Sequence, residues 1–345
     1  MLETNRVAAA IASHADSLTL GASLGPALIE QCGGRLSKVQ WFRSTWQHGG
    51  AATGFARWRE DDGQEIEVLV KVPVGPVEYR WTTNLWAVGV QGLSNGEARF
   101  LLNSLATPRV FASGEAIGGY DLAWLVIERL DGHTLSQGWC KESLEDLLFA
   151  AAMMQAQAAR LVPVTTAPAP PDWDRLIHRA REVARRSEMP EAQHWNESVK
   201  RVCKVLPRLA AKWDARPVDS WCHGDLHPGN AMRRRDTENG FGRPACVLID
   251  LALVHAGHWV EDAIYLERQL WAHPEGLFGI HPVSLLARYR RELGLPTSGD
   301  YGAVANLRRL LSAACAPVYL EHDGSPKYLH AALETIDRLL PQVAH

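Results

Sequence analysis

The sequence predicts an α+β protein of two lobes, a small antiparallel sheet followed by a larger helical part. Three observations carry this prediction. The chain has 345 residues, enough for two separate cores. Short runs rich in β-branched and aromatic residues, separated by turn signals, occupy Leu36 to Glu128. Beyond them, alanine- and leucine-rich stretches have helical spacing. We therefore expect a helical extension at 1–35, a sheet lobe at 36–130 and a helical lobe at 131–345.

Composition favours a cytoplasmic protein that binds neither nucleic acid nor membranes. The formal net charge is -3 and 22% of the residues are charged, so no basic surface is indicated. Six cysteines are widely scattered without a C-x-x-C pair, which favours reduced thiols over disulfides or zinc. The N-terminus does not resemble a signal peptide, and no apolar run is long enough to span a membrane. The sequence does not indicate the oligomeric state.

A glycine-bearing stretch near the start of the sheet lobe is a candidate phosphate site. The strands predicted around it are Val39–Arg43, Phe55–Arg59 and Glu65–Val72. Gly49 and Gly50 lie between the first two strands, and Lys71 lies near the end of the third. Glycines let backbone N–H groups approach phosphate oxygens, and a lysine supplies a point charge. A plain hairpin turn would use the same glycines, so both interpretations stay open.

The segment after Lys71 leads to a glutamate with two possible roles. We predict that Pro73–Leu93 is an irregular surface loop anchored by two tryptophans. The following helix begins near Ser94, and Glu97 would be the third residue of a capping box with that serine. Alternatively, Glu97 would form an ion pair that holds Lys71 in position for phosphates. The presence of Lys71 upstream favours the ion pair, and one side chain can serve both roles.

The sheet lobe ends in a candidate hinge. Val110–Ser113 and Leu122–Glu128 are the next two predicted strands, and the chain then leaves the sheet. An adenine could hydrogen-bond to backbone groups of Glu128 and Leu130 there. Such contacts need no particular side chain, so they leave little trace in a sequence.

The stretch from Cys222 to Asp250 gathers polar residues around a predicted hairpin. Asp225 and Asn230 precede the first arm, and Asp250 follows the second. The two arms are predicted at Ala231–Arg235 and Ala245–Ile249. Because a hairpin returns the chain to its starting edge, these polar side chains should come together. Two carboxylates and a carboxamide suit a hard cation such as Mg²⁺, with one carboxylate left for a substrate hydroxyl.

Together these motifs resemble those of the protein kinase-like fold. Lys71 on a strand, Glu97 on the next helix, a hinge, HGDLHPGN at His223–Asn230 and an Ile-Asp pair ending at Asp250 follow its order. The HGDLHPGN form is similar to that of the aminoglycoside phosphotransferase and choline kinase-like branch. The resemblance covers about residues 36–270. It implies a bilobal fold, ATP and Mg²⁺ as cofactors, and a phosphoryl-transfer reaction.

The resemblance also implies a role for each matching residue. Asp225 would act as the base toward a substrate hydroxyl, and Asn230 and Asp250 would bind Mg²⁺. Lys71 would contact the α- and β-phosphates of ATP, steadied by Glu97. Two histidines, His223 and His227, would brace the catalytic loop. Asp262, at the spacing of the family's Gly-Asp-Pro-x-x-Asp element, would be a buried carboxylate that hydrogen-bonds this loop.

Two features favour a small-molecule acceptor over a protein. Gly224 replaces the arginine that meets a phosphorylated activation segment in many protein kinases, and only residues 251–261 separate Asp250 from Asp262. We expect phosphorylation of a sugar, an amino alcohol or an aminoglycoside-like compound. His258-Trp259 stand where Asp-Pro is usual in the family. This departure lies near the substrate side, so it bears on the substrate class more than on catalysis. The alternatives are a non-catalytic nucleotide- or ligand-binding module and a kinase acting on a protein. Candidate acceptor-pocket residues are Trp259, Glu261, Glu267, Trp271 and Glu321.

Overall fold

A computed structural model describes most of the chain, and its contacts divide it into two compact units. The first unit comprises Met1–His133 and Met232–Leu253, and the second comprises Thr134–Ala231 and Val254–His345. The hairpin after Asn230 therefore belongs to the first unit, although the HGDLHPGN loop before it belongs to the second. The described residues are 19–42, 51–90, 105–130, 132–164, 171–186, 189–238, 244–297, 299–318 and 325–343.

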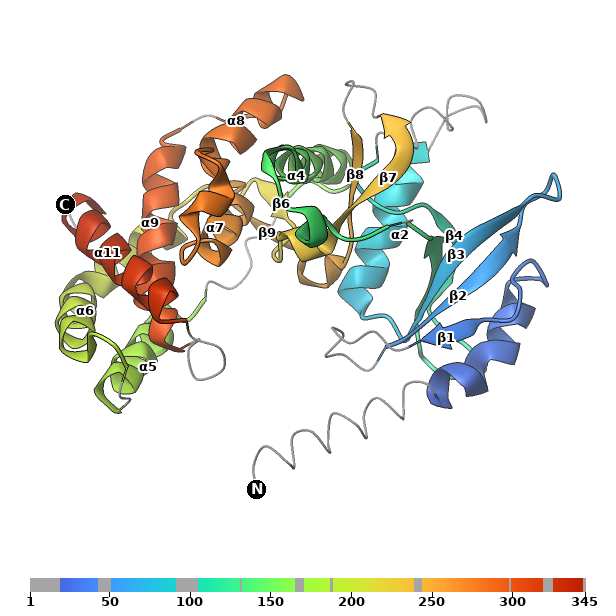
Figure 1. The fold of residues 1–345 in the computed structure, drawn as a ribbon, viewed down its shortest axis with the longest axis horizontal. Coiled ribbons are helices and arrows are strands. Elements are labelled where there is room, and N and C mark those ends of the chain that lie inside the picture. Colours follow the sequence, from blue (N-terminus) through green and yellow to red (C-terminus); the bar gives the residue numbers. More distant parts are fainter. Residues whose placement is uncertain are drawn as a thin grey trace. The chain divides into compact units, whose positions relative to one another are not determined.

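A five-stranded antiparallel sheet is the frame of the first unit (Figure 1). Its strands run in the order β1-β2-β3-β5-β4. Their bounds are β1 Gln40–Phe42, β2 Ala52–Arg59, β3 Glu65–Val72, β4 Val110–Gly114 and β5 Trp124–Glu128. All five strands were predicted, and the bounds of β3 are confirmed at both ends. Lys71 is opposite Thr53 of β2 and Leu125 of β5, so it lies in the middle strand of the sheet.

The two faces of β3 have different roles because side chains alternate along a strand. Val68, Val70 and Val72 are fully buried in one core. This core also contains Leu24 and Leu28 of a helix at 19–31, which continues through Pro26. Lys71 lies on the opposite face. The N-terminal segment therefore covers one face of the sheet and leaves the other face to the lysine.

The prediction of an irregular loop after β3 is wrong. Helix α2 spans Pro76–Val90. Proline suits a first helical turn, where its missing N–H would have no partner. Trp81 and Leu85, four residues apart, are 4% and 0% exposed, so this helix has a buried face. The tryptophan that suggested an anchored loop is part of a helix packed on its unit.

The predicted hairpin is present as two strands, β7 Ala231–Glu238 and β8 Pro244–Leu248, which form their own sheet. Two contacts attach it to the first unit. The Leu248 N–H donates to the Ala106 carbonyl at 2.8 Å. The Arg234 guanidinium donates to both carboxylate oxygens of Glu128 at 2.8 Å and to the carbonyls of Leu105 and Thr107. The hairpin that ends near Asp250 is thus anchored to the strand β5 and to the segment before β4.

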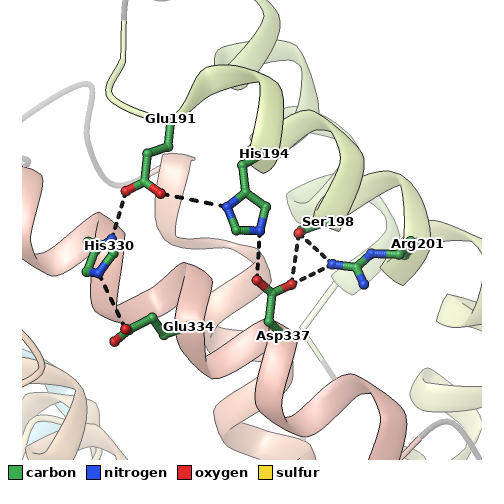
Figure 2. A network of polar contacts seen from close by, with 7 residues as sticks. All are labelled: Glu191, His194, Ser198, Arg201, His330, Glu334 and Asp337. Carbon is green, nitrogen blue, oxygen red and sulfur yellow. Dashed lines mark hydrogen bonds and ion pairs between the residues drawn. The ribbon is translucent and has the colours of Figure 1, made fainter.

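The second unit is mostly helical. One of its cores combines the indoles of Trp173, Trp195 and Trp213 with apolar side chains of the C-terminal helices. On its surface, polar side chains of α6 and α11 meet in one network (Figure 2). The elements are η1 Leu135–Gly138, α4 Lys141–Leu161, α5 Trp173–Arg186, α6 Ala192–Asp214, β6 Ser220–Cys222, η2 Pro228–Asn230, β9 His255–Gly257, α7 Val260–Gln269, η4 Pro274–Leu277, α8 Pro282–Glu292, α9 Tyr301–Ala314 and α11 Pro326–Val343.

All six cysteines carry free thiols, as predicted. Four of them are buried, and burial raises the pKa of the Cys32 thiol to about 11 and that of Cys315 to about 12. None of the helices in the described part of the chain combines the length and apolar character needed to cross a bilayer.

Candidate active site

In the first unit, Lys71 forms an ion pair with a residue that the sequence reasoning overlooked. Its Nζ atom lies 2.6 and 2.7 Å from the two carboxylate oxygens of Glu78, in the first turn of α2. Both side chains are largely shielded, with exposed fractions of 16% and 11%. An ion pair of this kind fixes a lysine that would otherwise sample many rotamers. Glu97, predicted as the partner of Lys71, lies outside the described residues, as do Gly49 and Gly50.

The same helix connects the lysine to the segment that carries Asp250. The 3₁₀ turn η3, Leu251–Leu253, follows Asp250 directly and packs against α2 within the first unit. Asp250 is exposed and has a φ of 60°, in the left-handed region. Non-glycine residues rarely adopt this conformation, and such outliers cluster at functional sites. The first unit therefore holds a paired lysine and an exposed, conformationally restrained carboxylate.

In the second unit, Asp262 holds the backbone of the HGDLHPGN loop, as predicted. The N–H groups of His223 and Gly224 each donate to its carboxylate at 3.0 Å. Asp262 is 1% exposed, so these bonds form in a dry environment where unpaired donors would be costly. Gly224 has a φ of 82°, which a residue with a Cβ atom would adopt only with strain. This explains physically why glycine stands at that position.

The carboxylate of Asp225 receives donors on both of its oxygens. The phenol of Tyr265 donates to Oδ1 at 2.5 Å. The Asn230 amide donates to Oδ2 at 2.9 Å, and the Nε2 atom of His227 lies 3.6 Å from Oδ2. The hydrogen bond from His227, followed by those from Tyr265 and Asn230, lowers the pKa of Asp225 despite partial burial. Asp225 is therefore ionised at any physiological pH.

Both histidines of the loop are structural, as predicted. The Nδ1 atom of His223 accepts from the Asp225 N–H at 3.2 Å, and the Nδ1 atom of His227 accepts from the Gly229 N–H at 3.0 Å. An Nδ1 atom that accepts a backbone N–H carries no proton, so each neutral ring holds its proton on Nε2. For His227 this places an N–H donor toward Asp225. Neither ring is in position to be a general base through Nδ1.

The donor types of Asn230 and Asp250 fit the cation that the sequence predicts. The Asn230 amide nitrogen is engaged by the backbone and side-chain oxygens of Asp225, so its carbonyl oxygen is the atom oriented for other contacts. Asp250 contributes an exposed carboxylate. Side-chain oxygens of both kinds are Mg²⁺ ligands. Within the described part of the chain, no three His, Cys, Asp or Glu side chains form a metal-binding cluster.

The predicted adenine contacts remain predictions. Glu128 uses its N–H for the Arg109 carbonyl at 2.8 Å, while its carboxylate pairs with Arg234 and accepts the Arg109 N–H. Its side chain thus serves the sheet. Leu130 lies just after β5 and is partly exposed.

Three of the residues expected to line the acceptor pocket, Trp259, Glu261 and Glu267, are buried instead. Trp259 is 1% exposed. The carboxylate of Glu261 pairs with Arg216, and that of Glu267 pairs with Arg309 through two bonds of 2.7 and 2.8 Å. Although burial raises the pKa of Glu261, His255 and the nearby arginines lower it to about 2. Because these side chains are buried and paired, the expectation is wrong for them. Trp271 stacks on Tyr328, and Glu321 lies outside the described residues.

Two residues at these sites were not found from the sequence, Glu78 and Tyr265. Glu78 lies in the segment for which the sequence predicts a loop, although the proline two residues before it is a signal of a helix start. Tyr265 follows Asp262 by three residues in α7, which places both on one helix face. Since Asp262 was expected to reach the catalytic loop, this spacing would have placed Tyr265 near the loop too.

Comparison with known proteins gives one family. The model of the phosphotransferase enzyme family (APH) matches residues 93–307, more than half of the chain. The match includes Asp225, Asn230 and Asp250 but begins after Lys71. A search of curated proteins found no significant match.

Solved structures with the same fold are distant in sequence. A Ralstonia eutropha JMP134 protein, provisionally named aminoglycoside phosphotransferase, is 15% identical with a TM-score of 0.54, covering 91% of this chain and 98% of that one. A microcompartment-associated aminopropanol kinase is 13% identical with a TM-score of 0.54 over 92% and 98%. Spectinomycin phosphotransferase, solved with ADP and spectinomycin, is 11% identical with a TM-score of 0.50 over 92% and 96%. These likenesses confirm the bilobal protein kinase-like fold.

Proposed function

Because the chain belongs to the phosphotransferase enzyme family, we propose that it transfers the γ-phosphoryl group of ATP to a hydroxyl group of a small molecule. The acceptor oxygen forms a bond to the γ-phosphorus, the bond from that phosphorus to the bridging oxygen breaks, and ADP leaves. The hydroxyl proton passes to Asp225. The products are ADP and a phosphate monoester.

The observation that carries this proposal is the state of Asp225. Its carboxylate is ionised, oriented by donors on both oxygens and held in a loop braced by a buried aspartate. A carboxylate with a lowered pKa is a weak base, which suits a reaction whose transition state is loose and whose proton leaves late. Its main task is to aim the acceptor hydroxyl, and positioning of this kind accounts for much of phosphoryl-transfer catalysis.

The first unit contributes Lys71 and Asp250 to the proposed binding of ATP and Mg²⁺. We assign Lys71 to the α- and β-phosphates, with Glu78 as the residue that keeps its ammonium in place. Asp250 and Asn230 each offer an oxygen ligand for Mg²⁺, which would neutralise charge on the β- and γ-phosphates when bound. Gly49 and Gly50, together with the backbone at Glu128 and Leu130, remain proposed nucleotide contacts, and Glu97 remains the residue that the sequence proposes to steady Lys71.

The relatives and the charges of the second unit support a proposal for the acceptor class. The structural relatives include a kinase of an amino alcohol and a phosphotransferase of spectinomycin. Two acidic side chains expected to attract a polycation, Glu261 and Glu267, are instead neutralised by arginines. This supports a compact acceptor with one hydroxyl near Asp225 over a highly cationic aminoglycoside.

A turnover assay tests the proposal against the non-catalytic alternative. The purified chain is incubated with ATP, MgCl₂ and a panel that includes aminopropanol, spectinomycin and simple sugars, and ADP formation is followed together with the phosphorylated product. We expect acceptor-dependent ADP formation for at least one compound. Thermal stabilisation by ATP and Mg²⁺ without turnover on any compound would instead indicate a binding module.

A further inference from the structure

The bond between Tyr265 and Asp225 goes beyond what the motifs explain. Tyr265 lies in α7, outside the HGDLHPGN loop, and is half-buried. Its hydroxyl donates to Asp225 Oδ1 at 2.5 Å. Burial, followed by the hydrogen bond to Asp225, raises the pKa of Tyr265 to about 12. The phenol is therefore protonated across the physiological range and is a permanent donor to the carboxylate.

The two oxygens of Asp225 are used unequally. Among the described residues, Oδ2 accepts from the Asn230 amide at 2.9 Å and faces the Nε2–H of His227 at 3.6 Å. Oδ1 faces Tyr265 alone among them. A carboxylate oxygen has two lone pairs. Each oxygen thus accepts one hydrogen bond, and the His227 ring lies close to Oδ2 in addition. The side of the carboxylate that is less crowded by these neighbours is Oδ1, next to the phenol oxygen.

The Tyr265 ring is itself held in position by a neighbour in α7. The guanidinium carbon of Arg268 lies 4.9 Å from the centre of the Tyr265 ring, one helical turn further along α7. One turn before, Asp262 accepts the N–H groups of His223 and Gly224. Helix α7 therefore contacts the catalytic loop twice, as an acceptor through Asp262 and as a donor through Tyr265. These opposed bonds fix the orientation of the Asp225 side chain relative to the helix.

We propose that Tyr265 is a positioning residue for phosphoryl transfer: its phenol fixes the Asp225 carboxylate so that the acceptor hydroxyl donates to Oδ1 beside it. This inference rests on the proposed function and deepens it, because it assigns the acceptor hydroxyl to one oxygen and one neighbour.

Tyr265→Phe tests the inference because it removes one oxygen atom and keeps the ring. Tyr301→Phe is the matched control, since Tyr301 is also partly exposed in the second unit and contacts Trp259 through its ring. With the acceptor that the wild-type protein phosphorylates from the panel of aminopropanol, spectinomycin and simple sugars, we expect Tyr265→Phe to lower kcat by about ten- to a hundred-fold, the rate equivalent of one charge-assisted hydrogen bond. The KM values for ATP and acceptor should change by less than about twofold, since the phenol acts through Asp225.

A second measurement does not depend on activity. In protein labelled with ¹³C at the tyrosine ring carbon that bears the hydroxyl, the Tyr265 signal is the one lost in Tyr265→Phe. It should shift in Asp225→Asn, whereas the Tyr301 signal should not. Unchanged kcat in Tyr265→Phe, or a Tyr265 signal indifferent to Asp225→Asn, would overturn the inference while leaving the proposed function intact. A wild-type protein that phosphorylates no panel member would remove the proposed function, and this inference with it.

Discussion

The ammonium group of Lys71 contacts both carboxylate oxygens of Glu78, at 2.6 and 2.7 Å. The lysine comes from the central strand of the sheet and the glutamate from the first turn of the helix that follows it. Both side chains are mostly shielded from water, so solvent screens their attraction less than on an open surface. The pair therefore joins β3 to α2 and sets the position of the charge assigned to nucleotide phosphates.

Glu78→Gln should impair turnover because it removes the charge that fixes Lys71. A hydrogen bond between charged groups contributes about 1.5–3 kcal/mol, so we expect kcat/KM for ATP to fall about tenfold or more. Glu67→Gln is the matched control. Glu67 lies on β3, like Lys71, and it pairs with Arg129, but its side chain is 56% exposed. Steady-state kinetics of both variants provide the test. Equal losses in the two variants would contradict the role assigned to Glu78.

Arg234→Met should destabilise the first unit. The guanidinium is 7% exposed and donates to Glu128 and to two backbone carbonyls, so its removal leaves a partly buried carboxylate without its partner. We expect a loss of about 3–5 kcal/mol in the free energy of unfolding, measured by urea denaturation. Arg57→Met breaks an exposed pair with Glu65 and should cost no more than about 1 kcal/mol. Similar midpoints for the two variants would show that Arg234 does not anchor the hairpin.

The network between α6 and α11 should depend on pH. Glu191 contacts His330 at 2.8 Å, and Glu334 contacts the other ring nitrogen at 3.4 Å (Figure 2). The hydrogen bond to Glu191 raises the pKa of His330 above 6.5, and the same bond lowers the pKa of Glu191 below 4.5. The histidine's contribution to stability is thus complete below pH 6.5 and is lost as the pH rises through its folded value. The glutamate's contribution is complete above pH 4.5 and is lost as the pH falls through its own.

Titration of the His330 ring signals by NMR measures this coupling directly. Glu191→Gln should lower the pKa of His330 toward 6.5. Glu334→Gln should lower it less, because its attraction to the ring is the smaller cause. A His330 pKa that is the same in wild type and Glu191→Gln would rule out the bond as the source of the shift.

Local patterns were sufficient for the elements whose residue types agree with their environment. The residue types of β3 predict its observed bounds, Glu65–Val72. Helix α2 was missed because threonines, valines and Gly89 give it weak helical propensity. Its buried face, formed by Trp81 and Leu85, stabilises it through tertiary packing, which a local pattern does not contain.

The residues of the candidate site likewise fall into those that a local motif predicts and those that depend on tertiary structure. Asp225, Asn230 and Asp250 are predicted from the motif and the hairpin between them and remain proposed site residues, whereas the predicted bonds from Asp262 to the loop are observed. Glu78 and Tyr265 are different because each meets its partner only after a helix has been placed. The acceptor-side glutamates were misassigned for a related reason. Their arginine partners, Arg216 and Arg309, are each more than forty residues away in the chain.

Asp225→Asn tests the central claim most directly. The variant keeps the size of the side chain and removes the charge that aims the acceptor hydroxyl. With ATP and Mg²⁺ bound, and with Asp214→Asn at an exposed position as control, single-turnover transfer to the best panel acceptor should slow by about a thousandfold or more. The affinity for ATP should change less than about threefold. Transfer at the wild-type rate by Asp225→Asn would contradict the assignment of this carboxylate to the reaction.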